Sequence, residues 1–542
     1  MQQHKGVRPN VILILADDMG YSDIGCFGSE IETPNLDRMG YGGIRFTQMY
    51  NCARCCPSRA SLLTGLYPHQ AGVGYMVSDL GEQFPGYRGF LKRNCITIAE
   101  LLKTSGYRTA MAGKWHVGGR YTFNEPNEDV TDDPRYPTPN SRGFAKFYGT
   151  LPGAGSYFNP FGLQLNGKLV QPESEQYYYT DAVTDFAVKS IQDFSSKKEA
   201  FFLFVSYTAP HWPLHALPED IERYRGKYLN GWDRLRAERY ERLVKENIID
   251  PGWQLSPRDE NIVSWKEEKW KEWEESRMAV YAAQVDRMDQ GIGRILDTLD
   301  SYGIKEDTIV LFLSDNGGSA EFLKEDGNFD FVYNKTRRGE QIRIGNIRGL
   351  MPGGETTYMS YETPWANVSN TPFRLYKHWV HEGGISTPFI YYWPKHCKPI
   401  VVHEPLHVVD IMATIADATD ADYPSELNGH RITPLEGESF YPLVQEKPWY
   451  RDRPICWEHE GNRAVRMREW KLVSKYPGGW ELYNMDLDRT ELQDISPGKS
   501  GLVSQMIDIY QDWADRCNVL PWDEVYPQLG AWYRSWADSP KK

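Results

Sequence analysis

The segment Asn10–Asp18 has the sequence NVILILADD, in which six consecutive apolar residues run directly into two aspartates. Three later segments repeat this layout: Thr109–Gly113 precedes Lys114 and His116, Phe201–Val205 precedes His211, and Ile309–Leu313 precedes Asp315 and Asn316. Unbroken apolar runs of this length are typical of strands buried on both faces, as in a parallel sheet. Ligands bind beyond the carboxyl ends of such strands, so four strand ends with polar side chains of catalytic type indicate one shared site.

Helical patterns lie between these runs, most clearly over Ile98–Ser105 and Ala279–Tyr302. Alternating strands and helices predict an α/β fold with a large, doubly wound, mostly parallel sheet flanked by helices. After about Pro434 the pattern changes to short strands separated by turns, followed by a closing helix over 501–517. We therefore expect a catalytic domain over residues 1–433 and a smaller α+β domain with an antiparallel sheet over residues 434–542.

Composition excludes several classes of protein. The chain has 542 residues, of which 40% are hydrophobic and 25% are charged, as in an ordinary globular protein. A net charge of −13 argues against nucleic-acid binding. No apolar run approaches the roughly 18 residues of a membrane-spanning helix. The polar start Met1–Lys5 does not resemble a signal peptide, so we expect a cytoplasmic protein, or a periplasmic or secreted one whose leader has been removed.

The segment Cys55–Gly65, with the sequence CCPSRASLLTG, is the most informative motif. Pro57 suits the first position of a helix, and Gly65 suits its end. Cys55 would then lie just outside the helix N-terminus, where free N–H groups and the helix dipole favour anions. Arg59, one turn later, can add a fixed positive charge. From these residues alone, the segment is either an anion site with a reactive cysteine or a buried cysteine near a surface arginine.

This segment resembles the Cys-x-Pro-Ser-Arg and Leu-Thr-Gly signature of the type I, formylglycine-dependent sulfatases, in the alkaline phosphatase superfamily. Only Cys55 stands at the required single-residue spacing from Pro57, which leaves Cys52 and Cys56 outside the signature. Further blocks agree with the family: Gly113–His116, Ala209–His211, Ser314–Gly317, and Lys377 five residues before Glu382-Gly383-Gly384. The stretches over residues 209–220 and 365–384 look most like the bacterial arylsulfatase branch.

The resemblance implies a covalent mechanism and a role for each matched residue. A formylglycine-generating maturation enzyme would oxidise Cys55 to an aldehyde, and one oxygen of its hydrate would attack the sulfur of a sulfate ester. Expulsion of sulfate by the second hydroxyl would then restore the aldehyde. The implied roles are sulfate binding for Arg59 and Lys114, general base for His116, and general acid for His211 with the help of Lys377.

Asp17, Asp18, Asp315 and Asn316 offer only oxygen ligands. Such ligands suit a hard cation, Ca²⁺ or Mg²⁺, rather than zinc. The resemblance favours Ca²⁺ and adds an oxygen of the modified Cys55 to its ligands. Lys114 and His116 would point to the same side if the chain stays extended between them, because side chains alternate along a strand.

The sequence says less about the alcohol that is released. Candidate substrate-binding residues are Trp212, His215, Tyr358, Tyr361 and Trp365. We expect sulfated sugars or glycans as substrates, with aryl sulfates also accepted. Two alternatives remain: a phosphatase or phosphonate monoester hydrolase of the same superfamily, and a non-catalytic protein that binds sulfated sugars and leaves Cys55 unoxidised.

Overall fold

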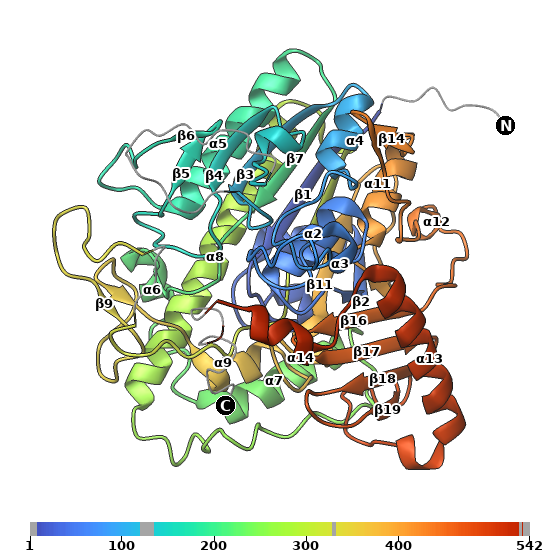
Figure 1. Cartoon of the computed structure of the whole chain (residues 1–542). Helices are drawn as coiled ribbons and strands as arrows, with labels where there is room; N and C mark the ends of the chain where they lie inside the picture. Colours follow the sequence, from blue (N-terminus) through green and yellow to red (C-terminus); the bar gives the residue numbers. More distant parts are fainter. Residues whose placement is uncertain (1–7, 120–134, 328–331, 531–533, 535–542) are drawn as a thin grey trace.

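The computed structural model describes residues 8–119, 135–327, 332–530 and 534. A large sheet with helices on both sides forms most of the molecule, and a second, smaller sheet lies beside it (Figure 1). The larger sheet has eleven strands and the smaller one has four. Within the described ranges, no helix combines the length and the apolar character needed to cross a membrane.

The centre of the large sheet consists of the four strands that the sequence predicted. They are β8 (Thr308–Ser314), β1 (Asn10–Ala16), β7 (Phe201–Ser206) and β3 (Arg108–Lys114), in that spatial order. All three pairings between them are parallel. Because neighbouring parallel strands end at the same edge of a sheet, the residues that follow these four strands lie along one edge.

Other strands extend the sheet on both sides. Beside β8 lie β11 (Ser386–Tyr392), β2 (Ile44–Tyr50), β12 (Ile400–Val402) and β13 (Leu406–His407), and beside β3 lie β4 (Lys146–Thr150), β5 (Leu163–Leu165) and β6 (Lys168–Leu169). Strand β11 runs antiparallel to both β2 and β8, so the sheet is mostly but not entirely parallel. The predicted α/β class is confirmed.

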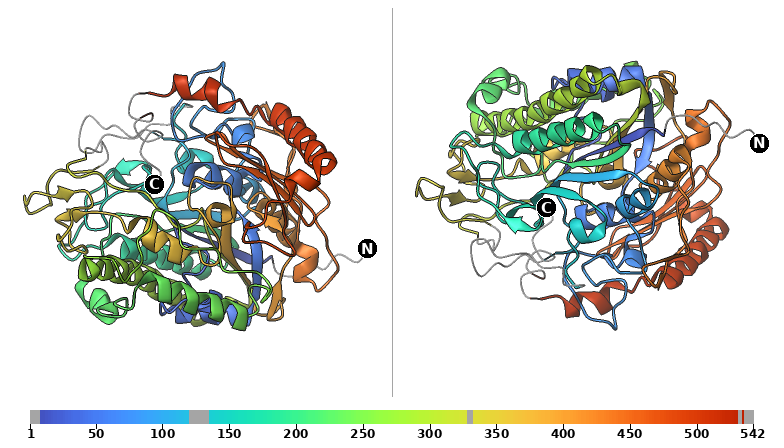
Figure 2. Two further views of the ribbon diagram at one scale, coloured as in Figure 1. Left: turned by 90° about the horizontal axis from the view of Figure 1, so that it is seen from below. Right: turned by 90° about the horizontal axis from the view of Figure 1, so that it is seen from above.

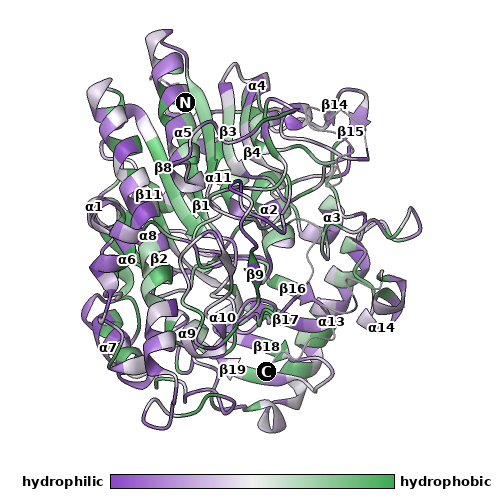
Figure 3. Cartoon of the chain, turned by 90° about the vertical axis from the view of Figure 1, so that its left-hand side faces the viewer, coloured by the Kyte–Doolittle hydropathy of each residue, from purple (hydrophilic) through white to green (hydrophobic). Residues whose placement is uncertain are grey.

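Helices cover both faces of this sheet, as the two views of Figure 2 show. On one face lie α2 (Cys55–Thr64), α4 (Ile98–Thr104) and α11 (Asp410–Thr419), and on the other lie α1 (Pro34–Gly42), α5 (Tyr179–Ser196) and α8 (Lys271–Ser301). Along β1, Val11, Leu13 and Leu15 pack in the first of these cores. Ile12 and Ile14 pack in the second. Burial on both faces explains the unbroken apolar run, and Figure 3 shows the hydrophobic strands inside the more hydrophilic surface.

The remaining elements lie in the connections and around the sheet edges. They are α3 (Pro68–Ala71), α6 (Pro218–Tyr224), α7 (Gly231–Lys245), α9 (Glu362–Ser369), α10 (Glu382–Ile385), α12 (Tyr441–Val444), α14 (Trp522–Val525), β9 (Arg343–Ile344), β10 (Thr357–Tyr358), β14 (Glu426–Leu427) and β15 (His430–Arg431). Most of them are short.

The C-terminal part contains the expected antiparallel sheet. Its strands are β16 (Ile455–His459), β17 (Asn462–Met467), β18 (Trp470–Ser474) and β19 (Glu481–Asn484), followed by α13 (Ser500–Cys517). Val465 and Leu472 pack against α13, while Trp457 and Ala464 pack against Tyr50 of the large domain. The expected boundary at residues 433/434 falls between β15 and α12. Residues 440 and 444, which follow it, still pack in the core of the large sheet.

Candidate active site

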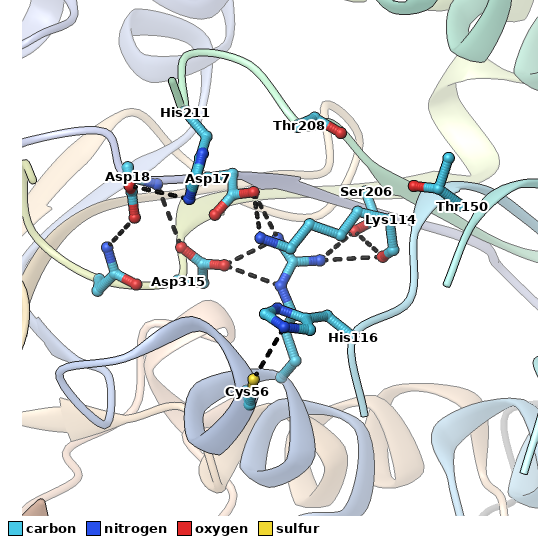
Figure 4. Close-up of polar contacts among 12 residues, drawn as sticks. Asp17, Asp18, Cys56, Lys114, His116, Thr150, Ser206, Thr208, His211 and Asp315 are labelled. Atoms are coloured by element: carbon cyan, nitrogen blue, oxygen red, sulfur yellow. Dashed lines mark hydrogen bonds and ion pairs between the residues drawn. The ribbon is translucent and has the colours of Figure 1, made fainter. Parts of the chain in front are cut away.

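The polar residues that follow the four central strands converge at one edge of the sheet (Figure 4). Asp17 and Asp18 follow β1, while Asp315 follows β8. Lys114 ends β3, and His211 lies five residues beyond β7. The structure therefore brings together residues from distant parts of the sequence, as the strand pattern predicted.

The Cys55 motif forms a helix that begins earlier than expected. Helix α2 starts at Cys55, not at Pro57, and ends at Thr64, directly before Gly65, whose φ is 66°. The first four N–H groups of a helix have no partner within the helix. A proline, which lacks this group, is therefore accepted at any of these positions and does not mark the first residue. Cys55 is thus the first residue of the helix, at its positive end.

Arg59 is fully buried, which excludes the alternative that it is a surface arginine near a buried cysteine. Its Nε donates to Asp315 Oδ2 at 2.8 Å, and one terminal nitrogen donates to the carbonyl oxygen of Lys114 at 3.0 Å. Its charge is therefore fixed one turn into the helix that begins at Cys55. A guanidinium held in this way is a fixed cation that can donate hydrogen bonds to the oxygens of an anion.

Two lysines pair with the remaining carboxylates. Lys114 Nζ contacts Asp17 Oδ2, and Lys377 Nζ lies 2.9 Å from Asp18 Oδ2. All four side chains are at most 3% exposed. Together with the pair between Arg59 and Asp315, the site places three cations opposite three carboxylates in a buried volume. Charges buried in this way are costly unless they are paired and their remaining hydrogen-bonding positions are satisfied.

The carboxylates are crowded. Burial raises the pKa of Asp17 well above its usual range, and the charge of Asp315 adds to the effect. Asp17 Oδ1 and Asn316 Oδ1 are buried without a hydrogen-bond partner, although Asn316 Nδ2 donates to Asp18 Oδ1 at 2.7 Å. Unpartnered oxygens among crowded carboxylates fit a divalent cation with oxygen ligands. The residues expected to hold the metal are therefore suitable for it.

His116 lies against the start of α2. Its Nε2 is 3.2 Å from Cys56 Sγ, and one ligand atom each of Cys55, Cys56 and His116 lie within 4.8 Å of one another. The φ of His116 is 57°, so the chain does not stay extended after Lys114, contrary to the expectation, yet both residues reach the site. Burial lowers the pKa of His116 to about 4. A hydrogen bond from Cys56, then Lys114 and His116, hold the pKa of Cys55 well below its usual range.

His211 lies on the opposite side of the carboxylates. Its Nε2 is 3.3 Å from Asp18 Oδ2 and 3.4 Å from Lys377 Nζ, and its Nδ1 is 2.6 Å from the carbonyl oxygen of Trp212. Burial lowers the pKa of its imidazole to about 3. Burial alone would lower the pKa of Lys377, but Asp18 and Glu321 raise it, so the lysine is the charged partner of the contact between Lys377 and His211.

The structure separates the candidate substrate-binding residues into two groups. The Trp212 ring lies 4.4 Å from the His211 ring and 5.9 Å from the Tyr358 ring, next to the expected general acid. His215 is fully buried, and its Nε2 lies 2.5 Å from the carbonyl oxygen of Thr357. Tyr361 stacks on Tyr281, and Trp365 packs among Trp232 and Trp265. Tyr358 is also fully buried. His215, Tyr358, Tyr361 and Trp365 thus belong to the packed interior, and of the five only Trp212 adjoins His211.

Three side chains that the sequence analysis did not select also belong to the site. Ser206 Oγ, at the end of β7, donates to the carbonyl oxygen of Lys114 at 2.7 Å. Glu321 pairs with Lys377 at 3.1 Å, and with Arg54, which directly precedes Cys55, also at 3.1 Å. Ser206 could have been found as the first polar residue after the predicted strand Phe201–Val205. Nothing in the local sequence distinguishes Glu321 or Arg54.

Comparison with known families agrees with the motif. The family model described as Sulfatase matches residues 9–421, which is well over half of the chain. A second model, described as N-sulphoglucosamine sulphohydrolase, C-terminal, matches residues 373–509. The two matches together span both sheets.

Individual relatives and solved structures are similar over nearly the whole chain. An uncharacterized sulfatase of Schizosaccharomyces pombe is 32% identical, covering 98% of this chain and 98% of its own length. An arylsulfatase of Klebsiella aerogenes is 32% identical, covering 82% of this chain and 94% of its own. The crystal structure of Ps i-CgsB in complex with k-i-k-neocarrahexaose is 27% identical with a TM-score of 0.65, covering 94% of this chain and 93% of that one.

Proposed function

The chain belongs to the sulfatase family and is a sulfuric ester hydrolase, and we propose that it acts through a formylglycine formed from Cys55. The observation that carries the proposal is the geometry around Cys55. This residue begins α2, with Arg59 one turn later and Lys114 and His116 close by. A modified residue 55 would therefore lie among groups that bind an oxyanion and accept a proton.

Sulfate binding falls to the buried cations. Arg59 contacts Asp315, and Lys114 contacts Asp17. When a sulfate group and a metal enter, these cations can turn part of their hydrogen bonding to sulfate oxygens. Such donors are held in place before the substrate arrives, so little reorganisation opposes the charge that develops on sulfate in the transition state.

Asp17, Asp18, Asp315 and Asn316 would hold the metal, which we propose to be Ca²⁺. Bound there, the cation would supply positive charge that attracts sulfate oxygens and lowers the pKa of a nearby hydroxyl. The two unpartnered oxygens of Asp17 and Asn316 support this assignment. All the expected ligand atoms are oxygens, which favours Ca²⁺ or Mg²⁺ over zinc.

The proposed chemistry needs two hydroxyls on residue 55. The hydrate of formylglycine supplies one hydroxyl that attacks sulfur and a second that expels sulfate afterwards. His116, on the α2 side of the site, is placed to take the proton of the second hydroxyl. His211 and Lys377, on the other side, are placed to protonate the departing alcohol.

The proposed substrate is a sulfated sugar or glycan, with aryl sulfates also accepted. Trp212 lies beside His211 and would offer the edge of its ring to a sugar ring or an aryl group, while the fully buried Tyr358 packs against Trp212. The similarity to the arylsulfatase of Klebsiella aerogenes and to Ps i-CgsB, which was solved with a carrahexaose, supports both substrate classes. Sugar specificity would arise in the loops above the carboxyl edge of the sheet.

The test uses protein expressed together with a formylglycine-generating enzyme. We expect the peptide that contains Cys55 to have the mass of the aldehyde. We also expect kcat/KM for 4-nitrophenyl sulfate to exceed that for 4-nitrophenyl phosphate by at least about tenfold. A preference for the phosphate ester would favour the phosphatase alternative. An unmodified cysteine with binding of sulfated sugars but no release of sulfate would favour the binding protein.

A further inference from the structure

We infer that Glu321 is the positioning residue for the leaving-group side of the site, where one carboxylate holds Lys377, Trp212 and Arg54 together. The inference rests on the proposed function, which assigns proton transfer to His211 and Lys377. Glu321 follows β8 by seven residues and lies outside every motif that identified the family. Its role must therefore be argued from its contacts.

The carboxylate of Glu321 is surrounded by donors. Oε2 accepts hydrogen bonds from Trp212 Nε1 at 2.7 Å, Lys377 Nζ at 3.1 Å and Ser319 Oγ at 3.1 Å, and Oε1 pairs with Arg54 at 3.1 Å. Its side chain is 15% exposed. A carboxylate has about four lone-pair positions for hydrogen bonds, so these contacts leave little freedom to rotate. The group is therefore a fixed point to which the other side chains attach.

The contact with Trp212 acts on His211. The two rings lie 4.4 Å apart, and His211 Nδ1 is 2.6 Å from the carbonyl oxygen of Trp212. The bond from the indole N–H to Glu321 stops the indole from turning away from the imidazole. His211 is thereby held with Nε2 toward Lys377, at 3.4 Å.

The contact with Lys377 has a separate consequence. Within the described ranges, Lys377 forms ion pairs with Asp18 at 2.9 Å and with Glu321 at 3.1 Å. Asp18 is one of the proposed metal ligands, and a bound cation would compete for its oxygens. Glu321 would then be the carboxylate that still holds the ammonium group beside His211.

The contact with Arg54 connects this side of the site to the nucleophile. Arg54 is the residue before α2, and its side chain is 11% exposed. Its ion pair with Glu321 therefore ties the start of the helix that carries Cys55 to the loop that carries Glu321. A shift of this carboxylate would therefore move both the start of the helix that carries Cys55 and the ammonium group of Lys377.

A role in positioning predicts an effect that depends on the leaving group. Glu321→Gln keeps an oxygen for the indole N–H but removes the charge that holds Lys377. We expect it to lower kcat for phenyl sulfate, whose leaving group is the more basic, at least about tenfold more than kcat for 4-nitrophenyl sulfate. We expect KM for both esters to change by less than about threefold.

Glu100→Gln is the matched control. Glu100 is 16% exposed, pairs with Arg142 at 3.1 Å and forms no contact with the site residues named above. This variant controls for the loss of a mostly buried, ion-paired carboxylate. It should change kcat for the two esters by the same factor. Trp212→Phe should share the leaving-group dependence of Glu321→Gln, and the double variant should lose less than the product of the two single effects.

An equal loss on both esters in Glu321→Gln, or no loss, would overturn the inference and leave Glu321 as a structural residue. If the glutamine variant folds poorly, Glu321→Asp serves in its place, since it keeps the charge but shortens the reach. Failure of the wild-type protein to release sulfate from either ester would instead refute the proposed function. The two failures are therefore distinguishable.

Discussion

Two buried ion networks in this protein contrast in how complete they are. The first is the site network of Asp17, Asp18, Asp315, Arg59, Lys114 and Lys377. The second, which we call the seam network, consists of Glu382, Glu491, Lys471 and Arg489, where the C-terminal sheet meets the large domain. The side chains of both networks are almost fully buried.

The seam network is closed. Lys471 Nζ lies 2.8 Å from a carboxylate oxygen of Glu382 and 2.8 Å from one of Glu491, and Arg489 Nε donates to Glu382 at 2.8 Å. Burial alone would raise the pKa of Glu382, but Lys471 and Arg489 lower it to about 2. Its charges therefore complete one another without any ligand.

The site network is open. Burial and a neighbouring carboxylate raise the pKa of Asp17, in the opposite direction to Glu382, and two oxygens of the expected metal ligands have no partner. The same degree of burial is thus accompanied by opposite pKa shifts, because the cations around Glu382 outweigh the effect of burial whereas those around Asp17 do not. The site network therefore has oxygens left to bind a cation, in line with the proposed function, whereas the seam network joins the C-terminal sheet to the rest of the molecule.

The largest expected effect is at the nucleophile. Cys55→Ala should lower kcat for 4-nitrophenyl sulfate by about 10⁴-fold or more, because no other side chain offers two hydroxyls. The free energy of unfolding should change by less than about 1 kcal/mol, since the residue packs only a small thiol at the start of α2. Cys52→Ala, a buried cysteine three residues away, is the control and should stay active. Retained activity in Cys55→Ala would contradict the mechanism.

The seam network should respond in the reverse way. Glu382→Gln should lower the free energy of unfolding at pH 7.5 by about 3–5 kcal/mol, because it leaves two buried cations without their shared partner. The kcat of the folded protein should stay within about threefold of wild type. Urea unfolding followed by intrinsic fluorescence, beside the kinetic assay, measures both quantities.

The pH dependence of this effect has a defined sign. The folded pKa of Glu382, about 2, lies below its ordinary value of 4.5, so its stabilising contribution is complete above pH 4.5 and is lost as the pH falls toward 2. The difference between wild type and Glu382→Gln should therefore be smaller at pH 3.5 than at pH 7.5. A difference that grows in acid would mean that the carboxylate is not the stabilising group.

The fold and the expected centre of the site were accessible from the sequence because their signals are local. Strands β1 and β8 are buried on both faces, which requires continuous apolar runs, and the catalytic side chains come directly after such runs. The motif at Cys55 concentrates several functional residues in one helix turn. The start of α2 was placed two residues too late, because a proline is accepted throughout the first turn. The start of α8 was placed eight residues too late, at Ala279 and not at Lys271.

Contacts between distant residues were not accessible in this way. Glu321 lies in a loop and contacts Arg54, Trp212 and Lys377, which are far from it in the sequence. No local sequence pattern around Glu321 predicts these contacts. His215 is near His211 in the sequence but is held in the interior by the carbonyl oxygen of Thr357, 142 positions away. Aromatic residues are equally suited to a core and to a sugar pocket, so their role depends on packing that only the fold defines.

The smallest of these effects separates the two networks by their response to metal. Adding Ca²⁺ to chelator-treated wild-type protein should raise the free energy of unfolding by about 2.7 kcal/mol when the metal is at 100 times its Kd. Asp17→Asn should lose most of this gain, because it removes one of three carboxylates from the expected site. Glu382→Gln should keep all of it, although it starts from a lower stability, since the carboxylate oxygens of the seam network already contact Lys471, Arg489 or a backbone N–H. A gain with Zn²⁺ but not with Ca²⁺ would contradict a site built from oxygen ligands, and a gain lost equally in both variants would mean that the two networks are not independent.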